Sequence, residues 1–217
     1  MQKVQSKDPW SMEVNPNCSE MGYALTSEEK SYLLRVARGS IEAAVKRKVY
    51  SPIKPADQNL ARAAGVFVTI KKNGELRGCI GLIEPEFPLY QIVSKMAVRA
   101  ATCDPRFESV REDELKDLRI EISILSPLKK LSTIEEIEIG RHGLIIERGI
   151  HRGLLLPQVA TENNWNREEF LEYTCVKAGL DTEDYKSPDA RLYIFSAEIF
   201  GEKELGIPSE DNFAERK

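Results

Sequence analysis

An Asn-Gly dipeptide between two apolar runs is the strongest local constraint on how this chain folds. The runs are Gly65–Ile70 and Leu76–Ile83, and Asn73-Gly74 lies between them. Because Asn and Gly adopt the positive φ angles of a two-residue turn at little cost, the pattern predicts an antiparallel β-hairpin.

Two helices are expected on either side of this hairpin. Thr26 and Glu29 form a capping box, and the apolar stripe behind them predicts a helix from about Ser27 to Lys48. A second stripe follows Pro88, a favourable first residue of a helix. This helix should end near Asp104, because the next residue is proline.

The rest of the chain adds strands around one more helix. Strands are predicted at Leu118–Leu125, Gly143–Arg148, Gly153–Leu156 and Arg191–Phe200. Asn166 caps a third helix, which ends before Gly179. The order helix, hairpin, helix, strands, helix, strand lacks strict βαβα alternation. It therefore predicts an α+β fold, with helices packed on a mostly antiparallel sheet.

Length and charge limit the domain count and the functional class. The 217 residues fit one large domain or two closely joined ones, here residues 26–201, with an extended arm at 1–25 and a charged tail at 202–217. The net charge of −4 makes nucleic-acid binding an unlikely general role. No run nears the about 18 apolar residues of a membrane span, and no signal-peptide core opens the chain, so the cytoplasm is the expected compartment.

No cofactor or metal motif is recognisable. The cysteines Cys18, Cys79, Cys103 and Cys175 form no CxxC pair, so free thiols and no zinc site are expected. A Gly-rich phosphate loop, a Gly-x-Ser-x-Gly elbow and a zinc-protease motif are also absent from the sequence. Cys103 and Cys175 fall on apolar helix stripes, which predicts that both lie in the core.

The strongest candidate for chemistry is Cys79, which lies between two glycines in the return strand of the hairpin. Strand periodicity places Arg77, Cys79 and Gly81 on one face and Gly78 on the other. A guanidinium near Cys79 would favour the nucleophilic thiolate, and Gly81 would leave open space beside the sulfur. The simpler alternative is a small buried thiol in a strand whose glycines shape a bulge.

The segment Leu76–Gly81, followed by Glu84-Pro85, resembles the signature of the AMME chromosomal region protein family (AMMECR family). Four further segments resemble the family's other sequence blocks and occur in the same order: Val66–Leu76, Asp104–Phe107, Gly140–Leu144 and Gly153–Val159. The resemblance covers roughly Leu25 to Gly201 and leaves the N-terminal arm outside. It implies a larger and a smaller subdomain with a cleft between them, at which the segment around Cys79 lies.

The resemblance implies no reaction. Bacterial and archaeal relatives often accompany a Memo-like protein and a radical SAM protein, which associates the family with such partners without giving a mechanism.

Four other residues are candidates for a site. His142, in a Gly-Arg-His-Gly turn, is a general base if the fold brings it to Cys79, and otherwise a solvated turn residue. Asp104 and Arg106 form either a ligand-binding ion pair or an ordinary helix-ending turn. Gln158 follows the end of an apolar strand, where it lines the cleft or caps the next helical turn.

Two functions follow from these residues. The first is an enzyme in which Cys79 is the nucleophile, Arg77 favours its thiolate and His142 moves protons. The second is a binding module whose cleft holds a small molecule, a peptide or a partner protein, with Arg77 and Gln158 as polar anchors. Regulation through nucleic acid is weaker, because no aromatic platform accompanies the basic residues of the hairpin.

Overall fold

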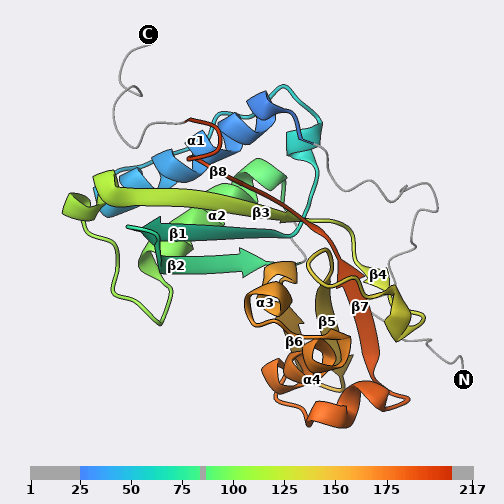
Figure 1. Cartoon of the computed structure of the whole chain (residues 1–217). Coiled ribbons are helices and arrows are strands. Elements are labelled where there is room, and N and C mark those ends of the chain that lie inside the picture. The colour runs from blue at the N-terminus through green and yellow to red at the C-terminus, as the bar shows by residue number, and fades with distance from the viewer. Residues whose placement is uncertain (1–24, 84–86, 207–217) are drawn as a thin grey trace, which may run out of the picture.

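The structure, a computed structural model, describes residues 25–83 and 87–206 and has two lobes, each built on a four-stranded antiparallel sheet (Figure 1). The larger lobe contains α1 (Ser27–Val45), α2 (Leu89–Thr102), β1 (Val66–Lys72), β2 (Glu75–Leu82), β3 (Leu118–Leu125) and β8 (Ala197–Gly201). The smaller lobe contains β4 (Lys129–Lys130), β5 (Gly143–Arg148), β6 (His151–Leu155), α3 (Pro157–Glu162), α4 (Arg167–Lys177) and β7 (Arg191–Phe195). The predicted α+β fold is confirmed.

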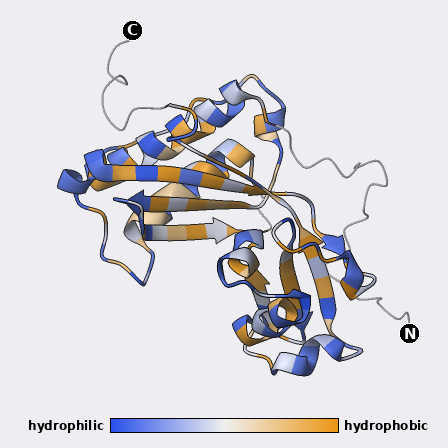
Figure 2. Ribbon diagram, in the orientation of Figure 1, coloured by the Kyte–Doolittle hydropathy of each residue, from blue (hydrophilic) through white to orange (hydrophobic). Residues whose placement is uncertain are grey.

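The sheet of the larger lobe has the strand order β2-β1-β3-β8, with β2 at one edge. Helices α1 and α2 pack together, and α2 lies against β1 and β2. The side chains of Val66, Val68 and Ile70 are buried in this helix-covered core, and Figure 2 shows the alternation of apolar and polar residues along β3. Side chains between these positions point to the opposite side, which we call the outer face; it carries Phe67 and Thr69 of β1.

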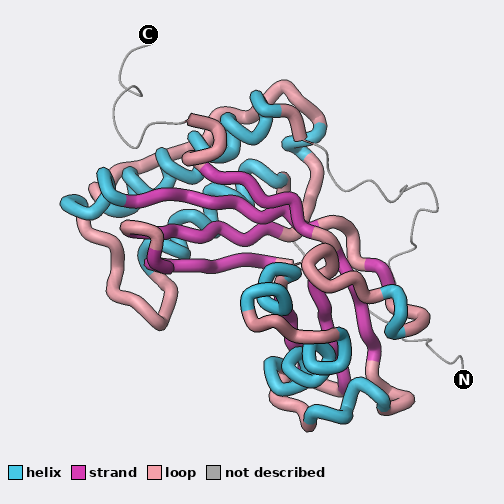
Figure 3. The backbone as a smooth tube through the Cα atoms, viewed as in Figure 1, coloured by secondary structure: helices cyan, strands magenta, loops and turns pink. Residues whose placement is uncertain are grey.

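Within residues 25–83 and 87–206, the chain crosses between the lobes twice, at Ser126 and at Ser196. The Ser126 N–H donates to the Ser196 carbonyl at 2.9 Å, and the Ser196 N–H donates to Ser126 Oγ at 3.0 Å. The predicted strand Arg191–Phe200 is therefore wrong as one element: it divides at Ser196 into β7 of one sheet and β8 of the other (Figure 3). An apolar cluster built on Leu125, Ile145 and Phe195 joins the lobes.

Most helix ends match their predicted signals. Thr26 caps α1, Asn166 caps α4, and Gly179 after α4 has φ +73°. Helix α1 ends at Val45, three residues before the predicted end, because the chain turns there and Arg47 adopts φ +53°. The short α3 and β4 were not predicted. In the described residues, no helix has the length and apolar character required to cross a bilayer.

The folded part of the chain extends slightly beyond both predicted boundaries. Leu25, expected at the end of the arm, is buried in the larger core, while residues 1–24 lie outside the described residues. Glu202, expected to begin the tail, has a fully buried side chain that pairs with Arg38 of α1. The tail from residue 207 onward lies outside the described residues.

Candidate functional site on strand β2

Strand β2 contains a bulge that decides which of its side chains lie together. The register opposes Ile70 to Gly78 but Lys71 to Leu76, so Arg77 has no partner in β1. One extra residue in a strand moves the residues beyond it to the opposite face of the sheet.

Because of this bulge, Cys79 lies opposite Thr69 on the outer face. The Thr69 hydroxyl donates to Cys79 Sγ at 3.3 Å, and the Cys79 side chain is partly exposed. On the other side of Thr69, β3 places Glu121, whose carboxylate binds Lys71 at 3.1 Å. A thiol, a hydroxyl and a carboxylate thus form a row across three strands.

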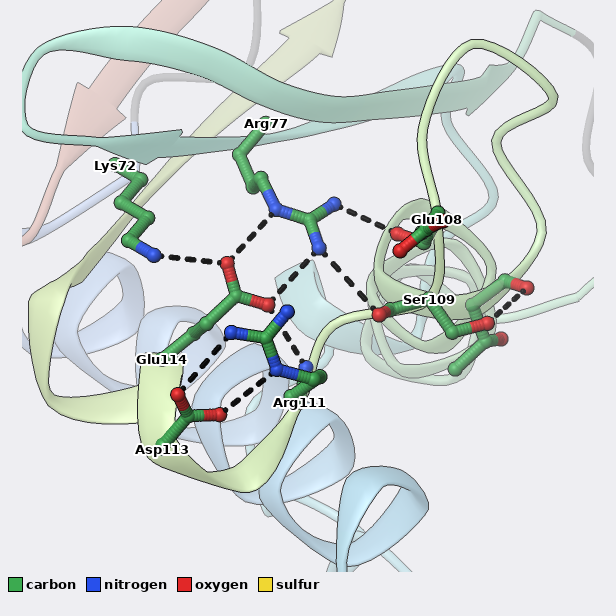
Figure 4. A network of polar contacts seen from close by, with 8 residues as sticks. Lys72, Arg77, Glu108, Ser109, Arg111, Asp113 and Glu114 are labelled. Atoms are coloured by element: carbon green, nitrogen blue, oxygen red, sulfur yellow. Dashed lines mark hydrogen bonds and ion pairs between the residues drawn. The ribbon is translucent and has the colours of Figure 1, made fainter.

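Arg77 lies apart from this row, so the prediction that it shares a face with Cys79 is wrong. Its guanidinium binds Glu114 through Nε at 3.2 Å and Nη2 at 3.0 Å, and also donates to the carbonyls of Glu108 and Ser109. Lys72 reaches the same carboxylate at 2.9 Å, and Figure 4 shows both cations extending from one side of the hairpin to Glu114. Arg77 therefore ties the hairpin to the segment before β3.

The buried Glu114 carboxylate predicts a specific pH dependence of stability. Hydrogen bonds from Arg77, then from the Arg111 N–H and Lys72, outweigh burial and lower the pKa of Glu114 from 4.5 to about 2. Because the folded pKa lies below the unfolded one, this stabilisation is complete above pH 4.5 and is lost as the pH falls toward 2.

We expect Glu114→Gln to lower the free energy of unfolding by about 1–3 kcal/mol at pH 7 and to flatten the decline of stability below pH 4.5. Urea unfolding at a series of pH values measures both effects. Glu112→Gln, an exposed change on the same short helix, is the control and should alter neither. A Glu114→Gln curve parallel to the wild-type curve at every pH would contradict the assignment.

At both glycines near Cys79, Gly78 and Gly81, neighbouring groups occupy the space that a side chain would need. A Cβ atom on Gly78 would lie 2.2 Å from the Ala100 carbonyl, so Gly78 lets α2 pack directly on the sheet. A Cβ atom on Gly81 would lie 2.2 Å from the Phe67 ring. The predicted open space beside the sulfur is therefore wrong, because Phe67 occupies the position next to Gly81.

Asp104 and Arg106 are brought to Cys79 by the loop after α2. The Asp104 carboxylate accepts the Cys79 N–H at 2.8 Å and the Arg106 N–H at 3.1 Å, and Arg106 Nη2 donates to the Cys79 carbonyl at 3.3 Å. Arg106 also binds Asp104 through Nε at 3.0 Å and Nη2 at 2.7 Å. The pair thereby satisfies the two main-chain groups that edge strand β2 presents at Cys79.

The electrostatics of this pair leave one cationic group accessible next to Cys79. The hydrogen bond from Arg106 holds the pKa of Asp104 well below its usual range, against the effect of burial. The same hydrogen bond and the charge of Asp104 raise the pKa of Arg106, against the effect of burial. The Asp104 side chain is only 2% exposed, whereas that of Arg106 is 54% exposed. In the described part of the chain, Arg106 Nη1 donates to no acceptor.

The remaining candidates lie in the smaller lobe. His142 Nδ1 accepts the Glu138 N–H at 3.1 Å, within its own turn. Gln158 is the second residue of α3, and its Oε1 is buried without a hydrogen-bond partner among the described residues. Among the described residues, neither side chain forms a hydrogen bond with Cys79.

Cys175 is buried as predicted, whereas Cys103 is exposed, because it follows the last residue of α2. Among residues 25–83 and 87–206, no three His, Cys, Asp or Glu side chains group as metal ligands would.

Sequence reasoning missed Thr69 and Glu121 as neighbours of Cys79. Counting back from a two-residue Asn-Gly turn would place Gly78, not Cys79, opposite Thr69. Only the two glycines in β2 signalled the bulge that shifts this register by one residue.

The fold and site define an α+β protein with two sheet-based lobes and a candidate site at an edge strand of the larger one. A protein-family model described as AMMECR1 matches residues 34–200. Protein MK0488 of Methanopyrus kandleri is 46% identical over 193 residues, covering 85% of this chain and 93% of its own length. Protein TK0174 of Thermococcus kodakarensis is 42% identical over 192 residues, covering 83% and 94%.

A solved structure has a similar fold. The uncharacterized protein PH0010 from Pyrococcus horikoshii is 41% identical, with a TM-score of 0.73, over 78% of this chain and 89% of that chain. The chain belongs to the AMMECR1 family.

Proposed function

We propose that this protein is a cytoplasmic binding module that holds a small carboxylate- or phosphate-bearing molecule on the outer face beside Cys79. One observation carries the proposal: the Arg106 side chain is 54% exposed, yet buried Asp104 fixes its guanidinium next to Cys79. A guanidinium matches the geometry of carboxylate and phosphate groups. Thr69 and Cys79 supply a hydroxyl and a thiol on the adjoining sheet surface.

Alkylation with a charged and a neutral reagent tests this proposal. We expect the rate ratio of iodoacetate to iodoacetamide to be about two- to fivefold higher at Cys79 than at exposed Cys103, the range for an exposed ion pair. Mass spectrometry of each cysteine gives both rates. Equal ratios at the two cysteines, or no reaction at Cys79, would overturn the proposal.

A paired variant assigns the effect to Arg106. Asp104→Asn with Arg106→Gln removes both charges and keeps an oxygen that can accept the Cys79 N–H. We expect its ratio at Cys79 to fall to that of Cys103. Arg111→Gln with Asp113→Asn removes an exposed ion pair beside Glu114 (Figure 4) and is the matched control.

A non-catalytic adaptor that acts with a Memo-like or radical SAM partner is the second candidate. It is favoured by the commitment of Arg77 to Glu114, because the enzyme hypothesis relies on Arg77 to favour the Cys79 thiolate. Co-purification with such a partner by both wild type and Cys79→Ser would support it. If wild type co-purifies with the partner and Cys79→Ser does not, the thiol is required for binding. That result would count against an adaptor that does not use the thiol.

A further inference from the structure

The segment that follows α1 carries an unusual combination of exposed side chains. Residues 46–55, here called the basic loop, contain four cations and no Asp or Glu. Two aliphatic side chains between these cations are open to solvent: Val49 is 99% exposed and Ile53 is 84% exposed. The cations are Lys46, Arg47, Lys48 and Lys54, all of them exposed.

The basic loop is held against α1, so this exposure is a built feature of the fold. The Tyr50 ring lies against Gly39, where a Cβ atom would be 2.7 Å from it, and the Tyr32 hydroxyl donates to the Ile53 carbonyl. Burial raises the pKa of both tyrosines. Tyr32 and Gly39 are seven residues apart in α1, and Tyr50 and Ile53 are three residues apart in the extended loop. Both separations span about 10 Å, so the loop runs back along α1 between these two contacts.

The charges near the basic loop favour an anionic partner. None of its four cations has an ion pair within the described part of the chain, and Arg35 of α1 adds positive charge beside Tyr50. The nearest acidic residues in sequence are Glu42 and Asp57, outside the loop. This local excess of positive charge contrasts with the net charge of −4 of the whole chain.

We propose that the basic loop docks the protein on an anionic phospholipid surface, with Val49 and Ile53 inserted between the headgroups. Lysine, the commonest cation of this loop, is depleted in protein–protein interfaces but common in membrane-surface segments. Aliphatic side chains next to such cations bury apolar surface at the headgroup boundary. The attraction weakens with salt, because the Debye length shortens.

Vesicle co-sedimentation of the full chain tests this inference. We expect binding to vesicles of equal parts phosphatidylcholine and phosphatidylserine at low salt, and loss of binding to phosphatidylcholine alone or at high salt. Absence of binding to the mixed vesicles at low salt overturns the proposal. Binding to poly-glutamate but not to vesicles also overturns it, in favour of an acidic protein partner.

Two variants assign the binding to the basic loop. Val49→Ser with Ile53→Ser should weaken binding about tenfold or more, because both apolar side chains no longer enter the surface. Lys46→Gln, Lys48→Gln and Lys54→Gln together should weaken it at least as much. Neither variant alters a core residue, so both should retain the wild-type thermal midpoint.

Matched changes elsewhere are the controls. Ile150→Ser with Val176→Ser removes two exposed aliphatic side chains from the smaller lobe. Lys116→Gln, Lys177→Gln and Lys203→Gln together remove three exposed cations. Both controls should bind vesicles as wild type does, and an equal loss of binding in the controls overturns the assignment to this loop.

Discussion

Replacing Glu202 by Gln should lower the free energy of unfolding by about 3–5 kcal/mol, the largest effect that we expect from a single substitution. The Arg38 and Glu202 side chains are 4% and 0% exposed, and Arg38 binds both carboxylate oxygens. Glu202 also accepts the Ile120 N–H at 3.0 Å. The amide keeps the shape of the side chain but leaves the Arg38 charge buried without a counter-charge.

This pair holds together three segments of the larger lobe that are distant in sequence: α1, the start of β3 and the residue that follows β8. Arg38 donates to the Leu115 carbonyl at 3.0 Å and to the Leu118 carbonyl at 3.1 Å, at the start of β3. Urea unfolding at neutral pH measures the loss. Glu183→Gln, which breaks an exposed pair with Lys186, should cost about 0–1 kcal/mol and is the control. Equal losses in the two variants would contradict the buried pair's role.

Replacing Asp104 by Ala should cost about 2–4 kcal/mol and open the edge of β2 at Cys79. The buried carboxylate accepts two N–H groups and holds Arg106, and all three interactions disappear together. We also expect faster hydrogen exchange of the Cys79 amide and faster alkylation of its thiol. Asp113→Ala, at a carboxylate 71% exposed, is the control and should change none of these.

The pH dependence of this variant follows from the lowered pKa of Asp104. The contribution of the carboxylate to stability is complete above the ordinary value of 3.8 and is lost as the pH falls below it. Asp104→Ala should therefore lose less stability than wild type on acidification below about pH 4. A variant that is as stable as wild type at pH 7 and declines equally with acid would show that Asp104 is not a structural anchor.

The elements that sequence reasoning predicted are those with strong local signals. The Asn73-Gly74 turn and the Thr26 and Asn166 caps are each fixed by a few neighbouring residues, and each is where it was expected. The division of Arg191–Phe200 into two strands was not predictable, because the apolar alternation continues through Ser196 and only pairing with Ser126 shows the change of sheet.

The candidate site was harder to predict than the fold, because its geometry depends on a bulge and on distant partners. Arg77, Cys79 and Gly81 alternate correctly for one face, but the extra residue at Arg77 separates its guanidinium from the thiol. Glu114, which forms an ion pair with Arg77, lies in an acidic stretch of sequence that resembles a solvated surface segment. Asp104 and Arg106 were candidates, yet their contacts with the main chain of Cys79 follow only from the tertiary fold.

A crystal structure of the protein carboxymethylated at Cys79 tests the central claim most directly, because the added group carries the proposed ligand chemistry. We predict that its carboxylate lies on the outer face, within hydrogen-bonding distance of the Arg106 guanidinium. A carboxymethyl group that points away from Arg106, while Asp104 still holds that side chain in place, would contradict a binding site for acidic molecules here.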